Sequence, residues 1–479
     1  MAGPDGCARD PAGGYEHDTA LLDRALRIDA SFDLATRDLL LDGRRARLYF
    51  VEGFVRSETL LRICGALLRA RAEELEECGD LNAFARRFIA HAEIETVVDA
   101  NDAVVKILAG KTALLVEGFS GALLIDAREY PVRAMQEPEN DRVLRGARDS
   151  FSETLLFNTA LIRRHVRDPR LTIEHHTVGS VSQTDVAIAY LCGRADAGAV
   201  ARLRERIEGL SVRSLTMGQE SLSEALIGKG AYNPFPKVRY TERPDMAAAT
   251  INEGRILVLV DASPSALILP TGFFDFFQST NDYNFPPLVG TYLRLTRFLI
   301  YFFTLLLIPT WFLLVSNPQW AVSQHDFIRI EEQNELPMIV QLLLIELIID
   351  CLRQASLNTP ASLGGSFSTV AALILGEFAV RARWFVPEVL LYMGFVAVAN
   401  FAQPSFELGY AFKLCRILLN VLVALFNVWG YLGGIALLLF LLATTPTVTR
   451  DSYLYPLVPF DGERLSRLLL RRRFHRDNS

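Results

Sequence analysis

The sequence has little of what would place it quickly in a class. Its 479 residues hold six cysteines, and none of these forms a Cys-x-x-Cys pair or another spacing typical of a metal site. The opening stretch, "MAGPDGCARDPAGGYEHD", contains neither the basic segment nor the apolar run of a signal peptide. We therefore expect reduced, structural thiols and an N-terminal region that stays in the cytoplasm.

An overall basic character is also missing. The formal net charge is -6 and the isoelectric point is near 5.8, whereas a nucleic-acid-binding domain usually carries a basic patch. We therefore exclude nucleic acid as a partner. Basic residues do gather at the C-terminal end, in "RLSRLLLRRRFHR" from Arg464 to Arg476. Beside a membrane, such a cluster marks the cytoplasmic side and contacts anionic lipid, and away from one it is a solvated tail. Both interpretations stay open.

Recognisable catalytic and metal-binding motifs are absent as well. The "AGKT" stretch ending at Thr112 resembles the end of a phosphate-binding loop, but Val105 stands where that motif requires its first glycine. The stretch also leads into a strand rather than a helix. His175 and His176 are neighbours on a predicted strand, so they point to opposite faces and do not share a metal. The sequence predicts no enzyme, no cofactor and no metal site.

Long hydrophobic runs are scarce in the first 290 residues and frequent after them. This difference predicts an α+β soluble N-terminal region of two related α/β subdomains, followed by an all-α multi-pass transmembrane domain. The expected parts are a disordered N-terminus (1–20), a first subdomain (21–130), a linker (131–150), a second subdomain (151–290), a helical membrane domain (291–446) and a basic cytoplasmic tail (447–479).

Four apolar hairpins define the soluble region. Each pairs two short apolar runs around a turn, in "RDLLLDGRRARLYFVEG", "TALLVEGFSGALLIDAR", "LTIEHHTVGSVSQTDVAIAYLCG" and "GRILVLVDASPSALILP". Gly53 and Gly193 end matching segments 140 residues apart, and Gly110 and Gly254 begin matching segments 144 residues apart. The nearly constant offset favours two related subdomains, although two ordinary hairpin–helix units would give a similar pattern.

Two helices are expected between these hairpins. Apolar residues at helical spacing follow Ser57, a candidate N-cap, through "SETLLRICGALLRARAEELEE". A second helix, with an amphipathic pattern, is expected over Phe151–Arg167, after a linker rich in proline and charge.

The apolar region offers several candidate membrane spans. Tyr292–Val315 is long enough to cross a bilayer, with Arg294 and Arg297 at its start and Trp311 near its end, as the positive-inside rule and the aromatic belt would place them. Two shorter runs follow within residues 366–404. The last run, "LCRILLNVLVALFNVWGYLGGIALLLFLLATTP", is one tilted span or two passes turning near "WGYLGG". Four or six crossings both fit.

The strongest anomaly is a set of charges in "PMIVQLLLIELIIDCLRQASLNTP". Glu346 and Asp350 share one helix face, and Arg353 lies three residues further on the same side. Such groups inside a membrane usually face a bundle interior or a hydrated path. They predict an ion pathway, a structural pair between Asp350 and Arg353, or a segment lying in the interface. Glu377 and Glu388 are further candidate intramembrane acids.

Several segments together resemble the spore germination proteins of the GerA A-subunit family. They are "EPENDRVLRGARDSFSETLLFNTALIRR", "NPFPKVRYTERPD", "VDASPSALILPTGFFDFFQSTNDY" and the run from "LGGSFS" through "VPEVLLY". The resemblance covers almost the whole chain, and "SFDL", "TPASL" and "YLYPLVPFDG" favour its stage V sporulation branch. The motif residues that we expect to be structural or to form interfaces are Arg145, Gly146, Arg148, Asp149, Arg243, Pro244 and Asp245.

The resemblance implies a multi-pass protein of the spore inner membrane with a cytoplasmic N-terminal domain. It further implies a ring-like homo-oligomer, a pentamer, that acts as an ion channel for monovalent cations beside other germination membrane proteins in the lipid bilayer. The alternative is a non-conducting membrane scaffold whose soluble lobes dock germination partners. A secondary transporter is disfavoured, because the apolar region shows no inverted repeat or paired broken helices.

Overall fold

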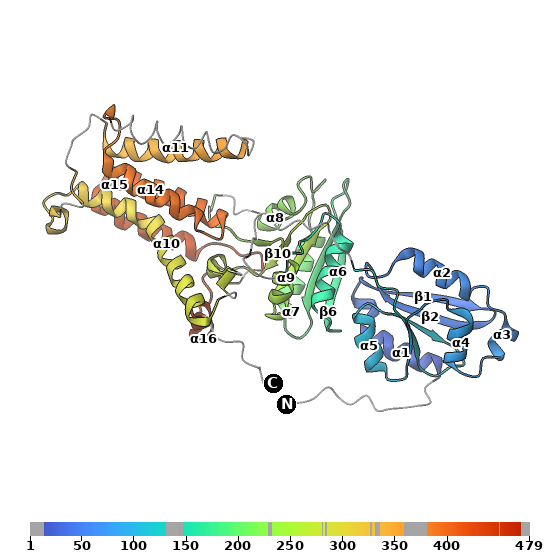
Figure 1. Ribbon diagram of the computed structural model, residues 1–479. Helices are drawn as coiled ribbons and strands as arrows, with labels where there is room; N and C mark the ends of the chain where they lie inside the picture. The colour runs from blue at the N-terminus through green and yellow to red at the C-terminus, as the bar shows by residue number, and fades with distance from the viewer. Residues whose placement is uncertain are drawn as a thin grey trace.

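The computed structural model arranges the chain as three parts in a row (Figure 1). We call them the first lobe (residues 14–130), the second lobe (147–282) and the membrane region (285–449). The second lobe lies between the other two. The structure describes residues 14–130, 143, 147–228, 232–279, 281–282, 285–325, 328–330, 336–358, 381–449 and 451–470.

The first lobe is built on an antiparallel five-stranded sheet with the strand order β1-β2-β4-β5-β3. Its elements are α1 (Tyr15–Leu26), η1 (Ile28–Ala30), β1 (Leu34–Leu41), β2 (Arg44–Val51), α2 (Ser57–Leu67), α3 (Ala72–Glu76), α4 (Leu81–Phe88), β3 (Ile94–Val97), α5 (Ala100–Leu108), β4 (Thr112–Val116) and β5 (Ala122–Ile125).

The second lobe has a matching sheet with the order β6-β7-β9-β10-β8. Its elements are α6 (Leu155–His165), β6 (Leu171–Val178), β7 (Thr184–Leu191), α7 (Ala197–Glu208), α8 (Gln219–Ile227), β8 (Arg239–Thr241), α9 (Pro244–Asn252), β9 (Ile256–Val260), β10 (Ala266–Leu269) and η2 (Phe273–Phe277).

The two lobes correspond strand for strand, and all four predicted hairpins are present. The paired glycines agree as well: φ is 84° at Gly53 and 83° at Gly193, and 100° at Gly110 and 90° at Gly254. A residue with a side chain rarely adopts these left-handed angles, which explains glycine at all four positions. The prediction of two α/β subdomains is confirmed, and their origin by duplication stays a prediction.

Helices cover both faces of each sheet, so alternate strand residues feed two separate cores. In the first lobe, α1 and α5 pack against the face that carries Tyr49, and α2, α3 and α4 pack against the face that carries Leu48. In the second lobe, α6 and α9 take one face and α7 and α8 take the other. Burial on both faces explains why β4 and β9 read as continuous apolar runs.

Two helix predictions in the lobes are wrong in detail. The helix expected after Ser57 is divided into α2 and α3, and Arg56 rather than Ser57 occupies the N-cap position. The helix α6 is buried on nearly all sides instead of being amphipathic, with Asn158, Thr159 and Arg163 all inside. The reason is its position between the lobes, where Ala160 joins the core of the first lobe.

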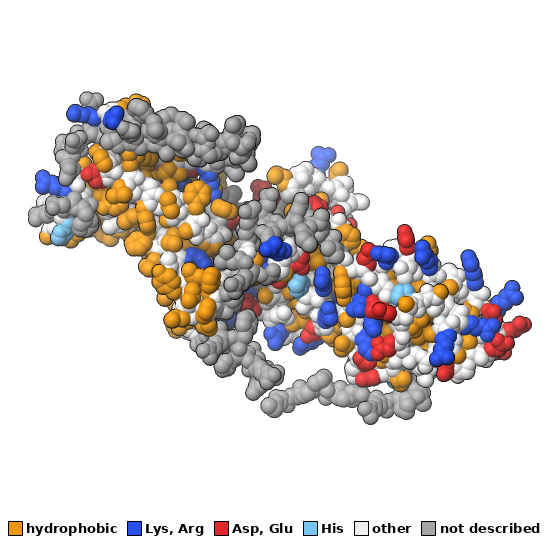
Figure 2. All heavy atoms as spheres, viewed as in Figure 1, with side chains coloured by type: hydrophobic (Ala, Val, Ile, Leu, Met, Phe, Trp, Pro, Cys, Tyr) orange, Lys and Arg blue, Asp and Glu red, His pale blue; other side chains and the backbone are white. Residues whose placement is uncertain are grey.

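The membrane region gathers the apolar helices, and Figure 2 shows hydrophobic side chains over its surface while charged side chains gather on the lobes. Among the described residues, two helices, spanning Pro287–Ser316 and Phe406–Ala443, are long and apolar enough to cross a membrane. The elements are α10 (Pro287–Val315), η4 (Ala321–Gln324), α11 (Met338–Asn358), α14 (Pro387–Phe401), α15 (Phe406–Ala443) and, beyond the region, α16 (Gly462–Leu469).

The helix α15 is not straight, because the chain folds back on itself at Asn427. This residue has φ 52° and ψ −127°, which no helix contains. Beyond it, a Cβ on Gly434 would lie 2.5 Å from a methyl group of Leu419. In a continuous helix these two residues would be roughly 22 Å apart. The last apolar run therefore forms a hairpin of two limbs, 406–426 and 428–443, which agrees with the two-pass alternative and places the turn just before "WGYLGG".

Candidate functional site and family membership

A cluster of buried charges joins three helices of the membrane region. Glu346 of α11 is only 3 % exposed and accepts a hydrogen bond from Arg416 Nε of α15 at 2.7 Å. The Arg416 Nη2 atom lies 2.6 Å from the same carboxylate oxygen, and Nη1 donates to the carbonyl oxygen of Thr304 in α10 at 2.5 Å. Arg416 is completely buried, so its charge is balanced inside the protein rather than by water.

Lys413 extends this cluster by one helical turn. Its ammonium lies 3.4 Å from Glu346 Oε2, donates to the backbone carbonyl of Glu346 at 3.3 Å and contacts the carboxylate of Asp350. Two acids thus face two bases, which makes the cluster electrically neutral. Neutrality allows four ionised groups to remain in an apolar bundle, because an unpaired charge there would cost several kcal/mol.

Local sequence explains why these side chains meet. Ser405 caps the start of α15 by accepting a hydrogen bond from Leu408 N at 3.2 Å. From that start, Lys413 and Arg416 are three residues apart and share one face of α15. Glu346 and Asp350 are four residues apart and share one face of α11. The structure therefore places both acids on one face, as their spacing predicts.

Arg353 lies against three aromatic rings rather than within the buried cluster. Its guanidinium carbon is 4.7 Å from the ring centroid of Tyr410, 5.2 Å from that of Phe406 and 5.9 Å from that of Phe401. Such cation–π contacts stabilise a guanidinium beside aromatic rings. The carboxylate of Asp350, the expected partner of Arg353, contacts Lys413, and the pairing of Asp350 with Arg353 stays a prediction.

The structure gives no ion pair for the two remaining predicted acids, Glu377 and Glu388, within its described residues. Glu388 lies in the first turn of α14, and its Oε2 atom is buried without a hydrogen-bond partner among the described residues. Glu377 lies outside the described residues. Near the cluster, three polar atoms of neutral side chains also have no hydrogen-bond partner within the described part of the chain. They are Oε1 of Gln403 and both amide atoms of the fully buried Asn420.

Sequence reasoning missed the two basic residues that complete the cluster. Lys413 and Arg416 stand in "FKLCRILL", where a charge in an otherwise apolar helix is the same signal that drew attention to Glu346. Their pairing with residues about 70 positions away has no local signature. Arg294 and Arg297 are also more than topology signals: both bind the fully buried Asp282, at 3.1 Å and 2.7 Å, and fix the start of α10 to the second lobe.

The motif residues of the lobes gather where two distant segments meet. Phe151 N donates to the carbonyl oxygen of Glu242 at 2.9 Å, which joins the "RDSF" and "YTERPD" stretches. The buried Arg243 binds Asp245 through Nε and Nη2 at 3.0 Å and 2.6 Å, at the N-terminus of α9 where Pro244 is the first residue.

Nearby, Asp149 lies 3.3 Å from His165 of α6, and hydrogen bonding to His165 holds the pKa of the Asp149 carboxyl below its usual value. Arg148 is exposed, and Arg145 and Gly146 lie outside the described residues. The geometry suits the structural role expected for Asp149, Arg243, Pro244 and Asp245, which stays a prediction.

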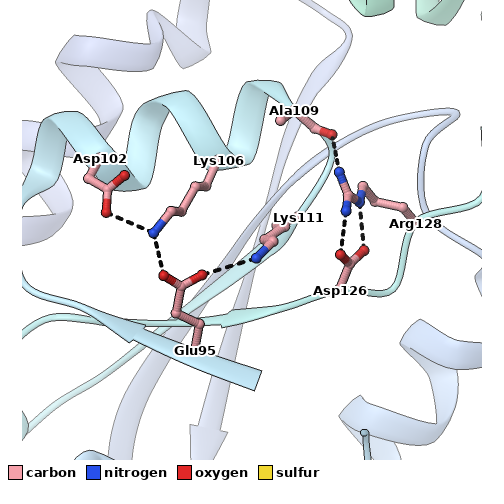
Figure 3. A network of polar contacts seen from close by, with 7 residues as sticks. All are labelled: Glu95, Asp102, Lys106, Ala109, Lys111, Asp126 and Arg128. Carbon is pink, nitrogen blue, oxygen red and sulfur yellow. Dashed lines mark hydrogen bonds and ion pairs between the residues drawn. The ribbon is translucent and has the colours of Figure 1, made fainter. Parts of the chain in front are cut away.

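The "AGKT" stretch lies in a network of surface ion pairs (Figure 3). Lys111 binds Glu95 at 3.0 Å, and Lys106 bridges Glu95 and Asp102. Hydrogen bonds from Lys106 and then Lys111 hold the pKa of the Glu95 carboxyl below its ordinary value. Thr112 begins the strand β4. The lysine of this stretch therefore pairs within the protein, next to a strand rather than the helix of a phosphate-binding loop.

Comparisons with known proteins agree with the resemblance seen in the sequence. Residues 22–479 match the model of the family described as Bacillus/Clostridium GerA spore germination protein. Stage V sporulation protein AF of Bacillus subtilis (strain 168) is 35% identical over 465 residues, which are 97% of this chain and 92% of that protein. Spore germination protein KA of the same organism is 29% identical over 76% of this chain and 67% of that protein.

Two further comparisons concern the membrane and the lobes. The uncharacterized membrane protein YfkQ of Bacillus subtilis (strain 168) is 26% identical over 82% of this chain and 76% of that protein. The N-terminal domain of the A subunit of the Bacillus megaterium spore germinant receptor GerK3 has 22% identity and a TM-score of 0.42, over 55% of this chain and 99% of that domain. Together with these relatives, two described helices that are long and apolar enough to cross a membrane identify the chain as a membrane protein. The matched family is not one of enzymes. The chain belongs to the GerA family of spore germination proteins.

Proposed function

We propose that the chain is the membrane subunit of a spore germination ion channel of the germinant-receptor A-subunit type. Several copies would form a ring, expected to be a pentamer, that releases monovalent cations across the spore inner membrane during germination, beside other germination membrane proteins. The lobes would lie on the cytoplasmic side. The observation that supports this proposal is the set of ionised groups kept inside an apolar bundle by a chain of the GerA family.

The geometry gives the two acids different roles in such a channel. Glu346 is buried and paired with Arg416 and Lys413 within one chain, so it holds α11 against α15. The side chain of Asp350 is 35% exposed and shares Lys413 with Glu346. Asp350 is therefore the acid that a hydrated path can reach, and an acidic ring at this level would concentrate cations.

Ion flux through purified protein in liposomes tests this division of roles. The Asp350→Asn variant keeps the size of the side chain and should lower potassium efflux per assembled complex severalfold. The Glu346→Gln variant should instead lower the yield of assembled protein. Leu347→Ala, a change at an exposed apolar position between the two acids, is the matched control. Unchanged efflux and cation selectivity in the Asp350→Asn variant, with assembly intact, would remove Asp350 from the pathway.

One observation favours the second candidate function, a non-conducting scaffold whose lobes dock germination partners. The acid Glu346 is satisfied within a single chain, as expected of a structural pair between helices. The two functions separate in one measurement, the efflux from liposomes that contain assembled wild-type complex compared with empty liposomes. Equal efflux, together with capture of germination membrane proteins by the isolated complex, would favour the scaffold.

A further inference from the structure

The chain leaves the membrane region through a loop whose apolar tip is uncovered. Within "YLYPLVPFDG", Leu457, Val458 and Phe460 are all exposed, and Phe460 is exposed by 73%. Three large apolar side chains so close together at a loop tip are unusual on a protein that meets only water. The loop is followed at once by α16, in which Leu465, Leu468 and Leu469 share one face.

Hydrogen bonds fix the base of this loop, so the exposed tip has a defined position. Tyr453 is buried, its hydroxyl donates to the carbonyl oxygen of Pro236 at 2.7 Å, and its own carbonyl accepts from Phe273 N at 2.8 Å. Asp461 caps α16 by accepting from Arg464 N at 3.0 Å, and it also accepts from the Tyr455 hydroxyl at 2.9 Å.

The position of α16 along the membrane helix α10 sets its depth. The Arg294 Nη1 atom of α10 donates to the carbonyl oxygen of Leu468 at 3.3 Å. The helix α10 has 29 residues and is thus roughly 43 Å long, whereas the hydrocarbon core of a bilayer is about 30 Å thick. If the end of α10 that carries Trp311 reaches the far side of the core, the turns around Arg294 lie at the headgroups of the near side.

Side chains on the first turns of α10 agree with this depth. Leu288, Tyr292 and Leu295 are exposed there, and tyrosine is a residue that favours the membrane–water interface. The loop tip and α16 therefore continue an apolar surface that already belongs to the membrane region. Basic residues accompany it: Arg464 is exposed on α16, and the sequence continues with Arg471, Arg472 and Arg473. Positive charge beside apolar side chains suits an anionic lipid surface.

We infer that Leu457–Phe460 and α16 form an interfacial anchor that inserts into the bilayer leaflet on the side of the lobes. The partner is the lipid of that leaflet, met by the apolar tip and the leucine face of α16, with the exposed Arg464 at the level of the headgroups. This role does not depend on whether the chain conducts ions. It ties the end of the chain to the same membrane that α10 enters.

Photo-crosslinking in the full-length protein tests the anchor. Phe460, and in a second variant Val458, is replaced by p-benzoylphenylalanine, and the purified protein is placed in liposomes of phosphatidylcholine and phosphatidylglycerol. Leu61, an exposed leucine on α2 of the first lobe, is the control position. After illumination, mass spectrometry should find severalfold more lipid adduct at positions 460 and 458 than at position 61.

Two results would overturn the inference. Lipid adducts no more frequent than at position 61 would mean that the tip stays in water. Adducts mainly to protein, either a second copy of the chain or a co-purified partner, would mean that a protein interface covers the tip. The aromatic replacement keeps an apolar side chain at an exposed site, so correct assembly is expected and is checked by size-exclusion chromatography.

Discussion

Among the buried arginine–carboxylate pairs of the described residues, two lie in contrasting surroundings, Arg163 with Asp33 between the lobes and Arg416 with Glu346 in the membrane region. Arg163 and Asp33 are both completely buried, and they meet through two contacts, at 2.7 Å and 3.1 Å. Arg163 also donates to the hydroxyl of Ser31 and to the carbonyl oxygens of Asp168 and Leu171. The soluble pair is thus surrounded by neutral hydrogen-bonding groups, while Glu346 and Arg416 depend on further charges, Lys413 and Asp350.

The difference follows from the surroundings that the ions of each pair enter when the protein unfolds. In the lobes, both ions would return to water, so the folded state must replace full hydration with hydrogen bonds. In a bilayer, the separated helices would still lie in lipid, so even an imperfect pair is better than two isolated ions. Hydrogen-bond completeness therefore matters most between the lobes, and charge balance matters most in the membrane region.

The largest expected effect comes from breaking the interlobe pair. Arg163→Met leaves Asp33 buried and unpaired and should lower the free energy of unfolding by about 3–5 kcal/mol. Thermal unfolding of the full chain in detergent measures it, with limited proteolysis reporting separation of the lobes. Arg170→Met, which removes a half-exposed partner of Asp168, is the control and should cost less than about 1 kcal/mol. Equal losses in both variants would contradict the importance of burial.

Breaking the membrane pair should cost slightly less and should be reversible. Glu346→Met leaves Arg416 without its carboxylate. This change should lower the stability of the folded protein by about 2.5–3.5 kcal/mol, the cost that membrane-insertion scales give for a charge at the centre of a helix. The double variant Glu346→Met with Arg416→Met should recover much of the loss, since charge balance is restored. Thermal stability of the detergent-extracted protein, followed by size-exclusion chromatography, measures both variants. A double variant no more stable than Glu346→Met would mean that the pair is needed for more than neutrality.

A backbone contact of the helical hairpin offers a third test, free of charge effects. A Cβ on Gly430 would lie 1.9 Å from the carbonyl oxygen of Leu422, whereas a Cβ on Gly433 would meet nothing within 4 Å. Gly430→Ala should therefore lower stability by about 1–3 kcal/mol, because the two limbs must move apart. Gly433→Ala should be neutral or stabilise the helix by up to about 1 kcal/mol. Similar melting temperatures in the two variants would argue against the fold-back at Asn427.

The smallest effect is expected at Asp149. Hydrogen bonding to His165 lowers the pKa of the Asp149 carboxyl in the folded protein. The carboxylate therefore contributes to the free energy of unfolding above the pKa of an aspartate in the unfolded chain, about 3.9. That contribution is lost as the pH falls through the lower folded value. Asp149→Asn should thus cost below about 1 kcal/mol at pH 6 and flatten the acid limb of the stability profile. Asp29→Asn, an exposed carboxyl, is the control, and an acid limb unchanged by Asp149→Asn would refute the assignment.

Local patterns in the sequence predict much of the fold. Turn glycines and alternating apolar residues locate the hairpins, because these features depend on a few neighbouring residues. The position of α6 between the lobes is not predictable in this way, because its burial depends on residues of the first lobe. Arg163 of α6 binds Asp33, and Ala160 of α6 packs into the core of the first lobe. The same holds for Glu346, whose spacing with Asp350 is visible while its partners on α15 are not.

The second lobe is fastened to the membrane region at both the entry and the exit of the chain. At the entry, Asp282 binds Arg294 and Arg297. At the exit, Arg202 donates to the carbonyl oxygen of Thr449 at 2.8 Å, and Tyr453 is bonded to Pro236. A tilt of this lobe would therefore displace the first and the last membrane helices together, because both are bonded to it. Force applied to the first lobe would reach the bilayer through the contacts between the lobes, among them those of Arg163 with Asp33 and Ser31.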